Sequence, residues 1–105
     1  ELKQTCSKND KIIFCGIEAK KLLINRIGNN EIKCVEEGKD QYKRILAECF
    51  VNNTSLSSYL VKEGYAFAYR KYSKKFVPDE NYARLNNLGM WSMKFEYPWD
   101  WRKKN

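Results

Sequence analysis

The sequence predicts a small α+β domain with three helices and one long β-hairpin. Apolar residues recur at helical spacing in residues 16–27, 55–63 and 79–88, and capping or terminating residues bound each stretch. Residues 31–51 instead combine alternating and apolar runs on either side of a polar turn, which is typical of a hairpin. Because the chain has 105 residues, we expect a single domain over residues 1–105.

The N-terminal residues 1–14 are mostly polar and predict an irregular segment that is tied down near Cys15. The first helix, over residues 16–27, then carries one apolar face, and Gly28-Asn29-Asn30 ends it. The apolar residues of that face are Ala19, Leu22, Leu23 and Ile27. We interpret this face as core, without a functional role.

The hairpin predicted for residues 31–51 turns at Gly38-Lys39-Asp40 into a strand that starts near Arg44 and ends at Asn52-Asn53. This turn should bring Asp40, Tyr42 and Arg44 close together at one end of the hairpin. Arg44 therefore lies where the turn becomes a strand.

The second and third helices follow after the hairpin. Thr54 or Ser55 caps residues 55–63, and Pro78 opens residues 79–88, which Gly89 terminates. Residues 65–69 between these helices predict a short extended segment. We expect an apolar group to pack back as core and the tail at Pro98-Trp99-Asp100-Trp101 to dock on the domain. The apolar group is Leu85, Leu88, Met90 and Trp91.

Composition and charge limit the possible functions. The net charge is +7, of which residues 1–60 carry about +2 and residues 61–105 about +5. Aromatic residues interleave with the basic ones in the second half, as on surfaces that bind nucleic acid; core aromatics with ordinary surface charge are the alternative. No apolar run reaches the ~20 residues of a membrane span, so we expect no membrane partner. Because the chain has no histidine, Ser-His and Cys-His mechanisms are excluded.

Four cysteines without Cys-x-x-Cys spacing favour disulfides over a zinc site or a redox dithiol. We predict Cys6–Cys15, closing a local loop, and Cys34–Cys49 across the hairpin. Disulfides imply an exported protein, secreted or periplasmic. The alternative is four reduced thiols in a cytosolic protein.

Arg44 is the strongest candidate for chemistry. A guanidinium at the start of a strand offers fixed donors and a permanent charge, which suits a phosphate; the alternative is a solvated charge that pairs with Glu37 or Glu48. The surrounding pattern, Asp-x-Tyr-x-Arg-x-Leu-Ala at residues 40–47, resembles the thermonuclease (staphylococcal-nuclease-like) family. Four further blocks occur in the family's order, at residues 60–66, 69–73, 89–91 and 98–103.

The resemblance implies a fold and a site. The fold is an α+β domain of the OB type, a five-stranded barrel with three helices, of which only the later barrel strands are present here. The implied activity is Ca²⁺-dependent endonuclease or exonuclease hydrolysis of DNA or RNA, with Arg44 and the matching glutamate, Glu1, as catalytic residues. The implied nucleic-acid-binding residues are Tyr42, Lys43, Tyr69, Arg70 and Lys71.

Two departures from the family pattern matter. Lys43 occupies the position of the family's usual glycine, so the turn before Arg44 can differ. The family's Asp-Gly-Asp-Thr segment, second arginine and calcium-binding aspartates precede the glutamate and do not occur in this sequence. We therefore interpret the chain as N-terminally truncated or as the product of a degraded gene. A non-catalytic module that binds nucleic acid or protein is the alternative to an enzyme, and we expect missing upstream sequence or a strand-exchanged homo-oligomer to complete the barrel.

Overall fold

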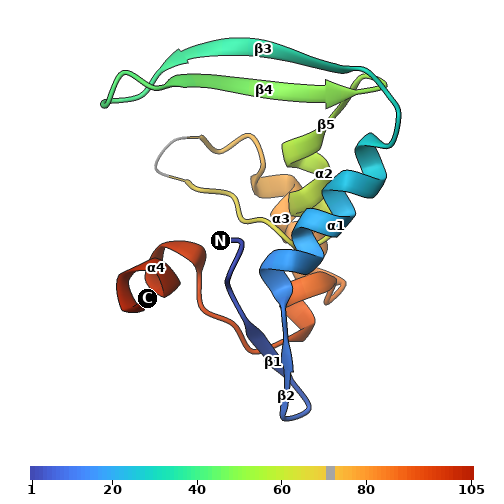
Figure 1. Cartoon of the computed structure of the whole chain (residues 1–105), viewed down its shortest axis with the longest axis vertical. Helices are drawn as coiled ribbons and strands as arrows, with labels where there is room; N and C mark the ends of the chain where they lie inside the picture. The colour runs from blue at the N-terminus through green and yellow to red at the C-terminus, as the bar shows by residue number, and fades with distance from the viewer. Residues whose placement is uncertain (71–72) are drawn as a thin grey trace.

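The computed structural model describes residues 1–70 and 73–105, which form an α+β domain with two small sheets (Figure 1). The elements in chain order are β1 (Cys6–Lys8), β2 (Lys11–Ile13), α1 (Cys15–Ile27), β3 (Ile32–Lys39), β4 (Ile45–Val51), β5 (Thr54–Ser55), α2 (Leu56–Lys62), α3 (Val77–Leu85), the 3₁₀ helix η1 (Gly89–Ser92) and α4 (Pro98–Lys104). In the part of the chain that the structure describes, no helix is long and apolar enough to cross a membrane.

The N-terminal segment is a hairpin, so the expectation of an irregular segment over residues 1–14 was wrong. Strands β1 and β2 pair antiparallel around Asn9 and Asp10, which both adopt positive φ, the conformation that tight hairpin turns require. Strands of three residues are too short to give a periodic signal in the sequence. The Cys6–Cys15 disulfide then fastens this hairpin to the start of α1.

The long hairpin confirms the prediction for residues 31–51. Cys34 and Cys49 lie opposite each other in the β3–β4 register and form the second disulfide, so both predicted pairings are present. A bulge between Glu36 and Gly38 shifts the register near the turn. Strand β5 joins the other edge of β4.

The two sheets do not form the barrel that the resemblance implies. Strands β1 and β2 form one open sheet, and strands β3, β4 and β5 form another in that order. Strand β3 therefore lies at an edge of the second sheet. Every residue of β3 is exposed, including Val35 at 58%. An open edge with exposed apolar groups is a surface that can pair with another strand.

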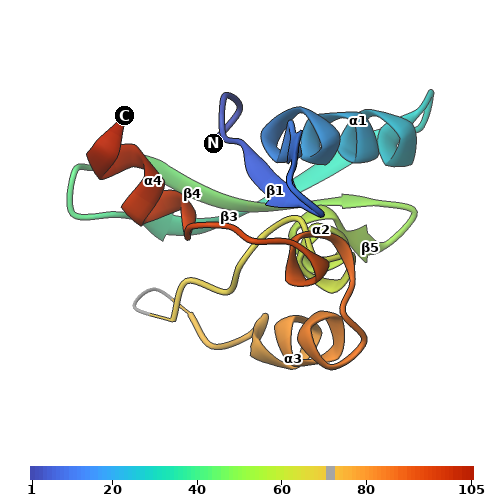
Figure 2. The same cartoon turned by 90° about the horizontal axis from the view of Figure 1, so that it is seen from below.

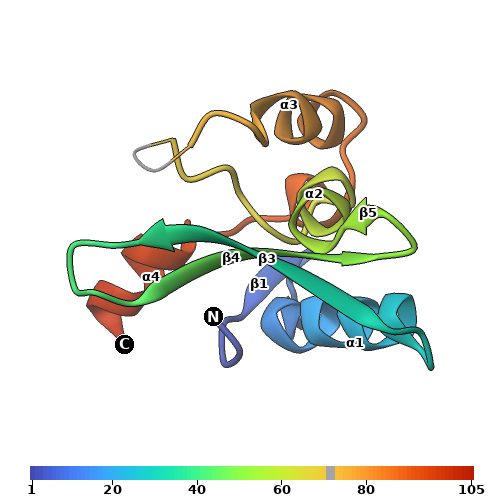
Figure 3. The same ribbon diagram turned by 90° about the horizontal axis from the view of Figure 1, so that it is seen from above.

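The three helices predicted from periodicity form, with shifted ends. Ser55 is the cap of α2, because its hydroxyl accepts a hydrogen bond from the Ser58 amide at 3.2 Å. Helix α3 ends at Leu85 rather than residue 88, since Asn87 adopts a positive φ of 51°. Figures 2 and 3 show α2 between α1 and α3.

One core cluster lies where β1, the start of α1 and η1 meet. Cys6, Cys15 and Met90 are buried together, and four half-buried residues pack against them: Tyr65, Phe67, Met93 and Phe95. Leu85 is 81% exposed, so its assignment to the core was wrong. Its position at the last turn of α3 explains this exposure. The C-terminal tail docks on the domain as predicted, through ring contacts described below, and it forms α4, a fourth helix that was not predicted from the sequence.

Candidate nucleic-acid interface

The turn between β3 and β4 is organised by the carboxylate of Asp40. Its Oδ1 accepts hydrogen bonds from the backbone amides of Tyr42 at 2.8 Å and Arg44 at 2.9 Å. Asp40 and Arg44 also pair through the backbone, with the Asp40 amide 3.0 Å from the Arg44 carbonyl oxygen. Side chains of aspartate favour such turns because they satisfy backbone donors that would otherwise lack partners. The prediction that Asp40, Tyr42 and Arg44 come together is confirmed.

Hydrogen bonds within the turn keep the Asp40 side chain as a carboxylate. Desolvation would raise the pKa of Asp40, but hydrogen bonds from the Arg44 backbone amide, the Arg44 side chain and the Tyr42 amide outweigh it and lower the pKa below its ordinary value. The side chain of Asp40 is only 2% exposed. Asp40 is therefore a structural anion rather than an acid or base for a reaction.

The side chain of Arg44 is fixed on one side and open on the other. Its Nε lies 2.6 Å from Oδ2 of Asp40, and its guanidinium carbon lies 5.3 Å from the centre of the Tyr42 ring. The alternative pairing of Arg44 with Glu37 or Glu48 is wrong. The side chain is 69% exposed, and its η nitrogens have no hydrogen-bond partner among residues 1–70 and 73–105. Arg44 therefore presents two preoriented donors to solvent.

Lys43, at the family's glycine position, adopts the left-handed conformation with φ of 65°. Its amide donates to the Asp40 carbonyl at 3.0 Å, closing the turn. A lysine is strained at this φ because its Cβ crowds the backbone. The turn thus keeps a glycine-like conformation despite the substitution.

Lys75 connects the hairpin to the segment before α3. Its Nζ donates to Glu37 on β3 at 2.7 Å and also to Glu48 on β4. The hydrogen bond to Glu37, followed by that to Glu48, raises the pKa of Lys75, and Lys75 in turn lowers the pKa of Glu48. Lys75 and Arg44 line one groove of about 690 Å³, with Ser73 and Phe76 on its second wall. The sequence could not reveal this contact, because Glu37 lies 38 residues away from Lys75.

Glu1 does not join Arg44 in this groove. Its carboxylate lies 3.0 Å from Nε of Arg102 on α4, and it lines a separate cavity of about 240 Å³ beside Gln4 and Pro98. The structure therefore brings Asp40, Tyr42, Lys43 and Arg44 together and leaves the second predicted catalytic residue elsewhere.

The described residues do not fit a calcium ion near Arg44. Calcium takes six to eight oxygen ligands, usually including several carboxylates. No group of three or more aspartate, glutamate, cysteine or histidine residues suited to a metal occurs in the ranges 1–70 and 73–105. The carboxylates of Glu37, Asp40 and Glu48 are each paired with a cation instead.

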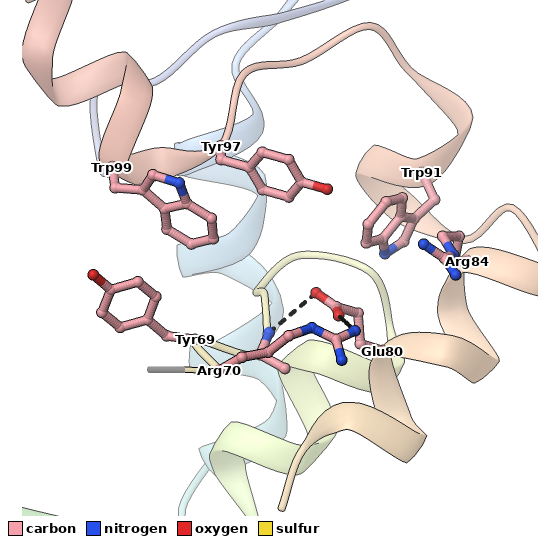
Figure 4. A pocket seen from close by; sticks show the side chains of 8 residues that line it. Tyr69, Arg70, Glu80, Arg84, Trp91, Tyr97 and Trp99 are labelled. Atoms are coloured by element: carbon pink, nitrogen blue, oxygen red, sulfur yellow. Dashed lines mark hydrogen bonds and ion pairs between the residues drawn. The ribbon is translucent and has the colours of Figure 1, made fainter. Parts of the chain in front are cut away.

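Tyr69 and Arg70 lie in a second cavity, which we call the aromatic pocket. It has a volume of about 360 Å³ and is lined by Ala68, Tyr69, Arg70, Glu80, Arg84, Trp91, Tyr97 and Trp99 (Figure 4). Glu80 is 7% exposed and accepts hydrogen bonds from the Ala68 amide at 3.2 Å and the Arg70 guanidinium at 3.0 Å. Lys71, also predicted to bind nucleic acid, lies outside the described residues.

The two sites face the same end of the molecule. In Figures 1, 2 and 3, the turn between β3 and β4, the segment that carries residues 65–70 and helix α4 all extend toward the left. Among the described residues, Lys75 forms ion pairs with Glu37 on β3 and Glu48 on β4, which joins the segment before α3 to the long hairpin.

Comparisons with known proteins show which family this chain is similar to. A "Probable staphylococcal-like nuclease CAN2" from rice (Oryza sativa subsp. japonica) is 33% identical over 91 residues, which is 84% of this chain and 25% of that protein. An "Uncharacterized endonuclease" from Haemophilus influenzae is 28% identical over 73% of this chain and 44% of its own length. A "Micrococcal nuclease" from Shigella flexneri is 29% identical over 84% of this chain and 59% of its own.

The chain thus spans only part of each of these relatives, from 25% to 59% of their length. The family model described as "Staphylococcal nuclease homologue" matches residues 4–93. That match includes the Asp40 turn, the groove and six of the eight residues that line the aromatic pocket, all except Tyr97 and Trp99. The chain belongs to the staphylococcal nuclease family.

Proposed function

We propose that this domain hydrolyses phosphodiester bonds in DNA or RNA and that Arg44 stabilises the charge that grows on the phosphate oxygens. The observation that carries the proposal is the fixed, exposed guanidinium: Asp40 holds Nε at 2.6 Å, while the η nitrogens face solvent. Planar, paired donors match two phosphate oxygens, and donors fixed before the reaction need no reorganisation during it. Removing one such donor commonly reduces the rate by ~10²–10³.

Arg44 acts on charge and does not transfer a proton, because a guanidinium stays protonated in water. Attack by water increases negative charge on the phosphate, and Arg44 binds this charge more tightly than it binds the ground state. Glu1 is the residue that the family resemblance assigns as general base, and it would have to leave Arg102 to act near Arg44. Calcium dependence is also part of the proposal by resemblance alone, since the described residues supply no ligand set for it.

Plasmid and oligonucleotide cleavage assays test this proposal. The wild-type chain, Arg44→Ala and the control Lys20→Gln are compared with Ca²⁺ and with chelator. Lys20 is an exposed residue of α1 and lines neither site, so its variant controls for the loss of one positive charge. We expect cleavage that falls at least ~10²-fold in Arg44→Ala only, and the comparison of Ca²⁺ with chelator tests the calcium dependence that rests on the resemblance alone. Equal cleavage by Arg44→Ala and wild type would contradict the role of Arg44.

A binding module without catalysis is the second candidate, and one observation favours it. Every carboxylate in the groove is paired with a cation, and Glu1 lies in another cavity, so no described carboxylate is positioned to activate water beside Arg44. In this case the domain binds oligonucleotides without cleaving them under any of the conditions above. Fluorescence anisotropy with a labelled oligonucleotide measures binding, so binding without cleavage in the assays above supports the module and binding with cleavage supports the enzyme.

We further propose that β3, β4 and β5 are strands of an OB-type barrel and that another strand pairs with the open β3 edge. The exposed edge and the family membership support this. Size-exclusion chromatography over a range of concentrations tests whether a second copy provides that strand. The two disulfides support a secreted or periplasmic location, which mass spectrometry of non-reduced protein from its native source would test; four free thiols would contradict it.

A further inference from the structure

The aromatic pocket has one wall built from stacked rings. Tyr97 and Trp99 lie parallel, with centroids 4.9 Å apart and an interplanar angle of 6°, and Tyr69 lies 5.1 Å from Trp99. Phe67 continues the series behind Tyr97 at 5.2 Å. Helix α4 and the segment before α3 therefore hold rings in fixed positions beside the cavity (Figure 4). Such rings can contact the face of a nucleobase of any sequence.

The opposite wall carries hydrogen-bond donors that the protein does not fully use. Arg70 is fixed by Glu80, whereas Arg84 is exposed and has no ion pair or side-chain hydrogen bond among the described residues. Trp91 Nε1 is buried and has no hydrogen-bond partner in the part of the chain that the structure describes. Figure 4 shows this nitrogen directed toward the pocket. A buried donor without a partner is unfavourable, so an acceptor in the pocket would satisfy it.

We propose that the aromatic pocket binds a single unstacked nucleotide of the substrate. Its base contacts Tyr69, Tyr97 and Trp99, and its phosphate lies near Arg84 and Trp91. The volume of about 360 Å³ falls in the range of pockets for small ligands. This inference rests on the proposed function for its substrate class, and it adds a site separate from the Arg44 groove. It also implies a single-stranded or frayed substrate, because a stacked base cannot enter the pocket.

Titration of the full chain with adenosine monophosphate, adenosine and inorganic phosphate tests this site. The tryptophan indole N–H signals in nuclear magnetic resonance spectra report on it directly, since Trp91 and Trp99 line the pocket and Trp101 does not. We expect the monophosphate to shift the Trp91 signal and to bind about tenfold more tightly than adenosine or phosphate. Arg84→Gln should bind the monophosphate about tenfold more weakly than wild type, and Arg84→Lys should lose only part of that affinity. Lys20→Gln should bind the monophosphate as wild type does.

Four results would overturn the proposal. They are equal binding of the monophosphate and adenosine, equal binding of the monophosphate and phosphate, unchanged binding in a folded Arg84→Gln variant, and shifts confined to Trp101. Circular dichroism verifies the fold of each variant.

The same experiment separates this inference from the proposed function. Arg44→Ala should lose cleavage but keep monophosphate binding, because Arg44 lies in the other groove. Cleavage without monophosphate binding would refute the pocket alone, whereas monophosphate binding without cleavage would refute the proposed hydrolysis alone.

Discussion

Replacing Lys43 by glycine should stabilise the domain. Lys43 adopts a φ of 65°, which costs an L-residue about 1–2 kcal/mol relative to the right-handed conformation. Glycine removes this strain but gains freedom in the unfolded chain, which offsets about 0.4–1 kcal/mol. The Lys43 side chain has no ion pair or hydrogen bond among the described residues, and the backbone bond to Asp40 is retained. We therefore expect a net gain of about 0.5–1 kcal/mol, or a rise in Tm of about 2–8 °C.

Thermal and urea unfolding of wild type, Lys43→Gly and Lys33→Gly measure this effect. Lys33 is the matched control, because it lies within β3, where glycine should instead lose about 0.5–1 kcal/mol. Both variants remove one positive charge, so an electrostatic effect on stability is shared and cancels in the comparison. If Lys43→Gly is destabilised as much as Lys33→Gly, that result would refute the claim that a strained left-handed conformation at Lys43 destabilises the domain.

Three further predictions concern the hairpin and its ligands. Replacing Cys34 and Cys49 by serine should lower the free energy of unfolding by about 3 kcal/mol, the amount expected for a sequence separation of 15 residues, as urea denaturation can measure. The pairing of Lys75 with Glu48 has two pH limits. The pKa of Glu48 is lowered in the folded domain. Its contribution to the free energy of unfolding is therefore complete above the ordinary glutamate pKa of 4.5 and is lost as the pH falls through the pKa of the folded state. The pKa of Lys75 is raised in the folded domain. Its contribution to the free energy of unfolding is therefore complete below the ordinary lysine pKa of 10.5 and is lost as the pH rises through the pKa of the folded state. Lys75→Met should therefore flatten the pH dependence of Tm at both limits. Finally, oligonucleotide affinity should fall steeply with added salt, and a flat response would exclude binding through phosphates.

The local elements were predictable because their signals are local. The turn residue Asp40 and the strand that follows Arg44 are adjacent in sequence, so the pattern at residues 40–47 was enough to place both groups at one end of the hairpin. The disulfide across the hairpin followed in the same way, since Cys34 and Cys49 face each other only if the hairpin forms in register. The β1–β2 hairpin was missed because its strands have three residues each, and an alternating pattern needs roughly four or more residues to be distinguished from chance.

The contacts between distant segments were not predictable from the sequence. Lys75 and Glu37 are 38 residues apart, and neither residue type indicates which oppositely charged residue will be its ion-pair partner. The burial of Glu80 was hidden for a related reason. An acidic residue in the first turn of a helix is usually a solvent-exposed group that interacts favourably with the helix dipole. Here Glu80 instead turns inward to bind the Ala68 amide and Arg70.

Lys75 lies in the segment before α3, near both the aromatic pocket and the Arg44 groove in the sequence. Residues up to Arg70 line the aromatic pocket, and residues from Ser73 line the Arg44 groove, so this stretch of chain passes from one site to the other. Lys75 pairs with both long strands and thereby fixes the groove wall relative to the hairpin. Its charge is already used by two carboxylates, which leaves Arg44 as the cation in that groove with open donors among the described residues. Under the proposed function, a phosphate in the groove would be held by Arg44, while Lys75 ties the groove wall to the two strands that flank the Arg44 turn.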